Sequence, residues 1–207
     1  MSRRVDLNRL RANSIKNLDD AMLLYDEASK ISDLDYELLW YIGTMVAVDI
    51  HATWERFAEK RLIAALNHDA GHFLHTNEIR GVTRVPVGLA TVLVRGASGY
   101  FDFRSTDDLI NKASRFLEKS SNPFHKIPRD VRNYLDTLSG VRNRIVHRSE
   151  LASANYKRLI RKTYGIKSAP EPEEFLSAID YRVNSPARKL SRLHGFVAML
   201  KRAIQHT

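Results

Sequence analysis

One long helical pattern, from Leu34 to about Asn67, constrains the fold of this chain more than any other feature. Its apolar residues recur at steps of three and four for about nine turns, which is typical of an α-helix. Residues 42–50 are apolar almost all round, which predicts a central helix that is buried on most sides. Asp49 interrupts this run, and a buried carboxylate needs a partner.

The other segments predict an all-α fold, an up-and-down bundle of five or six main helices with an irregular connector. A first helix spans residues 5 to about 30 behind the candidate N-cap Asp6, and Ser32-Asp33 is the candidate cap of the long helix. Further helices are predicted from Ser105 to about Asn122, from Pro128 to His147, over 151–164, over 173–179, and from Ser185-Pro186 to Ile204. We expect the first, second, Pro128–His147 and last helices to pack together in one domain of residues 1–207.

The connector, residues 78–105, is the least regular part of the chain. Pro86 can open a short helix through Val94, but the β-branched residues from Val82 to Val94 also permit a hairpin. Its arginines are compatible with a loop that contacts RNA and with a solvated connector, and the solvated connector is favoured.

The helix that ends at His147 carries groups suited to phosphate and proton chemistry. Its apolar stripe consists of Leu135, Leu138, Val141, Ile145 and Val146. Asn143 and His147 are four residues apart and share a face, whereas Arg142 lies about 140° round the helix from His147 and reaches it only through a long side chain. From the spacing alone, a surface helix end capped by His147 is the more ordinary interpretation.

The chemistry that suits this trio is RNA cleavage without a metal. A histidine titrates near neutral pH, so it can move a proton from a ribose 2′-hydroxyl or to the leaving oxygen. An arginine fork can hold the scissile phosphate, and an amide can orient the imidazole or bind a phosphate oxygen. The candidate catalytic residues are therefore Arg142, Asn143 and His147.

A resemblance to a known family rests on two segments. The first is Arg142-Asn143-Arg144-Ile145-Val146-His147, which is similar to the Arg-x4-His signature of the HEPN superfamily in its form with Asn after the Arg. The second is His51-Ala52-Thr53-Trp54-Glu55-Arg56-Phe57, which is similar to the aromatic-Glu segment on an early helix of several HEPN groups. The resemblance implies an all-helical, dimeric protein. It also implies metal-independent endoribonuclease activity of the toxin–antitoxin, abortive-infection or antiviral defence type.

The resemblance also bears on the surroundings of the trio. It suggests that Glu55 fixes Arg142 or His147 across a helix interface, although a surface carboxylate paired with a local base is an equal alternative. Asp49 is a second candidate for this supporting role. Some HEPN toxins carry a Tyr two residues after the His, and Ser149 stands there in this chain, so control by modification of that tyrosine is not expected.

Composition indicates a polyanion as a partner. The chain has 207 residues, a formal net charge of +9 and a pI of about 9.8. The cations expected to bind RNA flank the trio and occupy the next helix: Arg144, Arg148, Lys157, Arg158 and Arg161. Basic charge also serves solubility or binding to an acidic protein.

Other site and location classes are disfavoured by the sequence. There are no cysteines, no apolar run of about 18 residues and no signal-peptide pattern, so a cytoplasmic protein without a membrane partner is expected. The spacing of His68, His72 and His75 is compatible with zinc, but Gly71 weakens a helix there and histidines at a helix end are ordinary. We expect no metal and no cofactor.

These observations predict a metal-independent endoribonuclease that leaves a 2′,3′-cyclic phosphate. It would act as a two-fold homodimer in which the helices ending at His147 meet, and Gly140 would allow a kink or a close approach by a partner helix. A toxin restrained by an antitoxin or another defence protein is one setting for it. The alternative function is a non-catalytic module of the same fold that binds RNA or a protein. The sequence indicates neither the RNA substrate nor a trigger.

Overall fold

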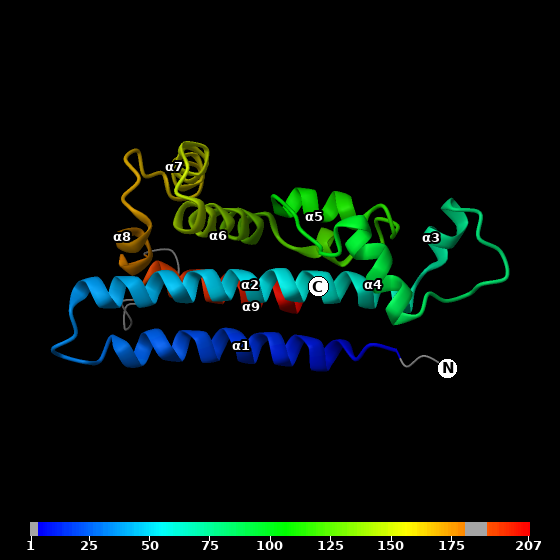
Figure 1. The fold of residues 1–207 in the computed structure, drawn as a ribbon, viewed down its shortest axis with the longest axis horizontal. Helices are drawn as coiled ribbons and strands as arrows, with labels where there is room; N and C mark the ends of the chain where they lie inside the picture. Colours follow the sequence, from blue (N-terminus) through cyan, green and yellow to red (C-terminus); the bar gives the residue numbers. More distant parts are fainter. Residues whose placement is uncertain (1–3, 181–189) are drawn as a thin grey trace.

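The computed structural model describes residues 4–180 and 190–207, and in these ranges the chain is all-α, as the sequence predicts (Figure 1). The α-helices are α1 (Leu7–Ala28), α2 (Tyr36–His68), α3 (Gly71–Thr76), α4 (Val87–Arg95), α5 (Thr106–Ala113), α6 (Arg129–His147), α7 (Glu150–Tyr164), α8 (Pro172–Ser177) and α9 (Arg192–His206). Two 3-10 segments, η1 (Gly96–Ser98) and η2 (Pro123–Lys126), connect them. Within the described ranges, the only extended pairing is an isolated bridge between Ile179 and Ser191.

The long helix α2 is the centre of the structure, because α1, α4, α6, α8 and α9 all contact it. From Ile50 onward it carries large side chains that are fully buried, namely Ile50, Trp54, Phe57, Leu62 and Leu66. The four helices α1, α2, α6 and α9 also form a closed ring of neighbours, in which each contacts the next. Figure 1 shows α2 between α1 on one side and α6 on the other, with α9 behind it. This arrangement fixes α6, the helix that carries the candidate catalytic trio, against the middle of α2.

The first half of α2 is less buried than its composition predicts. Met45 is 53% exposed, and Leu38 and Tyr41 on the same helical stripe are exposed as well. α1 covers only one side here, where Gly43 and the ring of Tyr25 pack closely. Within residues 42–50 only Met45 and Asp49 are exposed, so the predicted burial on most sides is confirmed for this stretch. The exposed stripe lies mainly in the turns before it.

The caps of the first two helices are local and polar. Asp6 accepts a hydrogen bond from the backbone N–H of Arg9 and caps α1, as predicted. The cap of α2 is Asp35, which accepts from the N–H of Glu37, and not Ser32-Asp33. The turn after Ala28 extends over residues 29–34. The side chain that caps α2 is therefore Asp35, two residues after the predicted Asp33.

The irregular connector contains a helix and no hairpin. α4 begins directly after Pro86, and it ends at Arg95, where Gly96 has a φ of 61° that suits glycine. Ser105 caps α5 through the N–H of Asp108, as predicted, but this helix stops at Ala113 instead of continuing to about Asn122. The buried side chain of Asn122 donates to the carbonyl of Ile110, which provides a partner for the helix end.

The helix α6 packs against its successor α7 in the same chain. The two are joined by a hydrogen bond from Thr137 Oγ1 to Thr163 Oγ1 (2.8 Å). A Cβ at Gly140 would lie 2.5 Å from Leu159 Cδ1, so this glycine is required by α7. The predicted close approach therefore occurs, but Leu159 of the same chain makes it, which removes Gly140 as an indication of a two-fold partner helix.

The last helix has the predicted apolar stripe and a different start. Its inward residues are buried, namely Leu193, Phe196, Val197, Leu200 and Ile204. The predicted cap, Ser185 with Pro186, lies outside the described residues. α9 begins at Arg192 behind Ser191.

No helix within residues 4–180 and 190–207 is both long enough and apolar enough to cross a membrane. The 33-residue α2 is the longest of them, and its second half carries charged side chains such as Glu55, Glu59 and Arg61.

Candidate functional site

The candidate catalytic trio lies at the exposed C-terminal end of α6. Leu135, Leu138 and Val141 are buried and anchor the helix on the core, as their spacing predicts. Ile145 is partly buried and still packs against the core, whereas Val146 is 49% exposed and does not join it. His147 is the last residue of α6 and is exposed to solvent.

The three side chains meet, and Arg142 is the group that joins them. Its Nη1 donates to Asn143 Oδ1 at 3.0 Å and lies 3.3 Å from His147 Nε2. Asn143 therefore holds the guanidinium, whereas the sequence predicted that it would orient the imidazole or a phosphate. A cation and a titratable ring, presented together to solvent, can bind a phosphate and move a proton beside it.

Glu55 of α2 stands next to this trio. Its Oε2 lies 3.5 Å from His51 Nδ1, and its side chain is one-third exposed. The interaction with the His51 ring lowers the pKa of Glu55, and the positive charge of Arg142 adds to this effect, while partial burial opposes it. The direct partner of Glu55 among the described residues is thus a base on its own helix, as in the alternative interpretation, and its fixing of Arg142 or His147 stays a prediction.

His51 connects the two helices that form the site. It is buried, and its Nε2 lies 2.9 Å from the hydroxyl of Ser139 on α6. Ser139 also donates to the carbonyl of Leu135 in the preceding turn. Sequence reasoning missed Ser139, because a serine inside a helix carries no signal until the residue facing it is known. The signal available for His51 was its place in the segment with Trp54 and Glu55.

Asp49 does not support the trio, contrary to expectation. Its side chain is 59% exposed, and its Oδ1 lies 3.6 Å from Nη2 of Arg56, about two helical turns further along the outer side of α2. The residues two positions apart on a helix point about 200° from each other, so His51 and Asp49 cannot both face α6.

Arg144 and Arg148, the arginines on either side of His147 in the sequence, lie near α8 and not with the trio. Arg144 Nη2 donates to Glu171 Oε2 at 3.0 Å, close to α8. Arg144 and Arg148 line a cavity of about 490 Å³ together with Trp40 and Tyr41. The same cavity is lined by Glu37, Glu171 and Glu173, so its carboxylates outnumber its two guanidinium groups. The backbone of Arg148 has a φ of 48°, because this residue ends α6 in the left-handed conformation.

The basic residues of α7 are exposed, as their proposed contact with RNA requires. Lys157 and Arg161 extend from the outer face of the helix, and Arg158 donates to Asn155 of its own helix at 2.7 Å. No contact within the part of the chain that is described joins these three cations to Arg142 or His147. Their role therefore stays a prediction.

The three histidines considered for zinc do not lie on one helix. His68, the last residue of α2, has its Nε2 2.9 Å from the carbonyl oxygen of Val5. Gly71 begins α3, so His72 and His75 lie on a different helix from His68. Among residues 4–180 and 190–207, no group of three or more His, Cys, Asp or Glu side chains is arranged to hold a metal ion.

The sequence and the fold were also compared with known proteins. No protein-family model, no curated protein and no solved structure matches the chain.

Proposed function

We propose that this protein is a metal-independent endoribonuclease of the HEPN type. The observation that carries the proposal is the convergence of Arg142 on His147 at the solvent-exposed end of α6, with Nη1 and Nε2 3.3 Å apart. The net charge of +9 supports a polyanionic substrate. The resemblance of the two sequence segments to HEPN proteins supports RNA as that polyanion.

In the proposed reaction the RNA supplies its own nucleophile. His147 takes the proton of a ribose 2′-hydroxyl, the 2′-oxygen attacks the adjacent phosphorus, and the bond from phosphorus to the 5′-oxygen breaks. The leaving 5′-oxygen receives a proton, and the products are a 2′,3′-cyclic phosphate and a 5′-hydroxyl. Arg142 binds the phosphate and stabilises the charge that develops on its oxygens, and Asn143 keeps the guanidinium in place.

A homodimer would complete this site. One histidine cannot both take and give a proton in a single concerted step, so a second copy of His147 across a two-fold axis would supply the other group. Within this proposal the protein belongs to a toxin–antitoxin or abortive-infection setting, where a partner protein restrains it.

The proposal is tested with purified protein and a labelled single-stranded RNA. We expect cleavage that persists in EDTA, leaves a 2′,3′-cyclic phosphate, and is absent for a substrate whose single 2′-deoxy nucleotide removes the attacking hydroxyl. Cleavage of DNA at a similar rate, or loss of activity in EDTA, would contradict the mechanism.

A second candidate function, a non-catalytic module that binds RNA or a protein, is favoured by one feature. The exposed stripe of Leu38, Tyr41 and Met45 on α2 is unusually apolar for a solvated helix face. Growth arrest on expression that is cured by His147→Ala would favour the enzyme. Equal effects of the unaltered protein and the variant would favour the binding module.

A further inference from the structure

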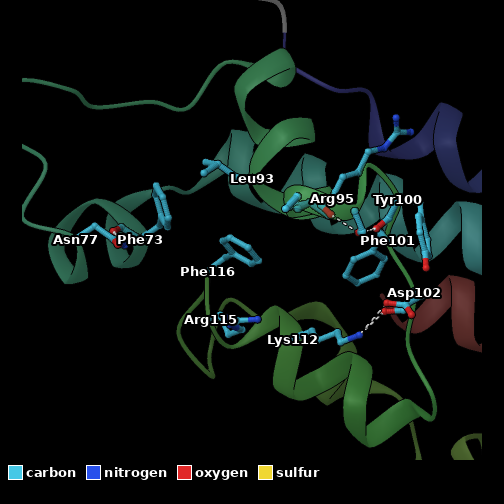
Figure 2. Close-up of a pocket in the computed structure, with 14 residues that line it drawn as sticks. Phe73, Asn77, Leu93, Arg95, Tyr100, Phe101, Asp102, Lys112, Arg115 and Phe116 are labelled. Carbon is cyan, nitrogen blue, oxygen red and sulfur yellow. Dashed lines mark hydrogen bonds and ion pairs between the residues drawn. The ribbon is translucent and has the colours of Figure 1, made fainter.

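A second concave region lies away from the trio, between the connector and α5. It is a cavity of about 500 Å³, bordered by α3, α4, η1, the loop that follows η1, and α5 with the turn after it (Figure 2). This volume is in the range of sites that hold a small planar ligand. The proposed cleavage reaction does not use it.

Aromatic rings form much of its wall. Phe73 and Phe116 lie with their ring centroids 5.9 Å apart, and Phe101 borders the same opening. Figure 2 shows these three rings around one space, with Tyr100 at its edge. Tyr100 is 63% exposed, so one ring of the set is available at the mouth. Such rings stack on nucleobases of any sequence, because every base has a flat π-face.

The charges around the cavity leave one cation without a compensating partner. Arg95 Nε is 2.5 Å from Glu59 Oε1, and Lys112 Nζ is 3.1 Å from Asp102 Oδ1. Arg115 is exposed, and in the part of the chain that is described it makes no ion pair. An unpaired guanidinium beside aromatic rings can bind the phosphate of a nucleotide whose base stacks on those rings.

The cavity is linked to α2, the helix that carries Glu55, through the ion pair of Arg95 with Glu59. Glu59, which holds Arg95 of the cavity, is one turn from Glu55, so about 6 Å of helix separates them. Glu55 in turn lies within electrostatic reach of both Arg142 and Asp102. Glu55 is therefore influenced by a cation of the trio and by a carboxylate that lines the cavity.

We propose that this cavity binds one nucleotide of the RNA strand, with its base among Phe73, Phe101 and Phe116 and its phosphate on Arg115. The inference rests on the proposed function, because it takes RNA as the ligand of this chain. It adds a nucleotide subsite outside the cleavage centre. Stacking of a base in this subsite would contribute to the affinity for RNA without involving the trio.

The test measures binding without cleavage. A 2′-O-methyl RNA 12-mer lacks the attacking hydroxyl, so its affinity can be measured by fluorescence anisotropy at fixed ionic strength on the full chain. We expect Phe116→Leu, which keeps apolar packing and removes the ring, to weaken binding about tenfold. Arg115→Ala should weaken it by a similar factor, whereas Arg129→Ala, which removes an equal charge at the exposed start of α6, should change it less than twofold.

A walk of single abasic sites along the 12-mer locates the base. At one position the abasic oligonucleotide should bind the unaltered protein about tenfold more weakly, and Phe116→Leu should abolish that difference. Circular dichroism and thermal melting establish that each variant is folded. A purely structural role for Phe116 would not remove the dependence on one base.

The outcomes separate the two proposals. If RNA is cut but Arg115→Ala and Phe116→Leu bind like the unaltered protein, the nucleotide subsite is wrong and the nuclease stands. If binding depends on the base and on Phe116 but no RNA is cut, the nuclease is wrong and the subsite stands. Failure of the unaltered protein to bind the 12-mer overturns the subsite.

Discussion

His51 Nε2 and Ser139 Oγ lie 2.9 Å apart and join α2 to α6 beside the candidate catalytic trio. His51 is buried, so this polar contact lies within the packed interface of the two helices. Arg142 follows Ser139 by one turn and Glu55 follows His51 by one turn, and the positive charge of Arg142 contributes to the lowered pKa of Glu55. The polar contact that joins the two helices here is thus made by two residues outside the trio.

His51→Ala should destabilise the protein by about 2–4 kcal/mol, because it leaves a space in the core and removes a buried polar contact. Ser139→Ala should cost about 1 kcal/mol, and the double variant less than the sum of both. Urea denaturation measures these differences. Ser14→Ala is the matched control, since Ser14 makes the same bond to the preceding turn without a partner on another helix; strict additivity of His51→Ala and Ser139→Ala would contradict the coupling.

Glu55→Gln should change the pH dependence of stability. The folded-state pKa of Glu55 is lowered by His51 and Arg142, so its ionised form stabilises the fold above the ordinary pKa of 4.5. That contribution, about 1 kcal/mol or less for a partly exposed group, is lost as the pH falls through the lowered pKa. Urea denaturation measures the free energy of unfolding of both proteins at pH 7 and in acid. We expect the difference between Glu55→Gln and the unaltered protein to be smaller in acid. A constant difference would contradict this, and Glu118→Gln, at an exposed position outside the site, provides the control.

Gly140→Ala should destabilise the protein by about 1–3 kcal/mol, because the added Cβ meets Leu159 Cδ1 at 2.5 Å. Leu159→Ala in the same chain should relieve part of the loss. Gly88→Ala in α4 is the matched control: nothing lies within 4 Å of its Cβ, and we expect it to stabilise by about 0.5–1 kcal/mol. Thermal melting of Gly140→Ala, Leu159→Ala, their double variant and Gly88→Ala measures these differences. An unchanged melting temperature for Gly140→Ala would contradict the close contact with Leu159.

His147→Ala should abolish RNA cleavage with a loss of stability of about 1 kcal/mol or less. His206→Ala is its counterpart, because His206 is likewise the exposed last residue of a helix, α9. We expect the two variants to lose similar stability, and only His147→Ala to lose activity. A stability loss several times that of His206→Ala would favour the helix-cap interpretation of His147.

Arg142→Lys should lower the cleavage rate about 10²-fold, since a lysine keeps the charge but not the planar fork that contacts both Asn143 and a phosphate. Single-turnover kinetics with saturating protein distinguish a slower cleavage step from weaker binding of RNA. Arg158→Lys, at an exposed position on α7, should cleave at nearly the unaltered rate. Equal losses for both variants would indicate general attraction of RNA instead of a catalytic arginine.

The sequence by itself determined the helical class, the caps at Asp6 and Ser105, and the meeting of Arg142 with His147, because all of these depend on residues within a few turns of each other. Periodicity records local geometry, so it can place a side chain on the face of its own helix. It did not reveal that Asp49 is exposed or that Ser139 faces His51, since those facts depend on how neighbouring helices lie.

Only the tertiary structure decided which neighbour each face meets. It assigned the close approach at Gly140 to Leu159, turned Arg144 toward Glu171, and brought the rings of Phe73, Phe101 and Phe116 from three separate segments to one cavity. These contacts join residues far apart in the chain. Their formation depends on the packing of whole helices, which no local pattern of residues encodes.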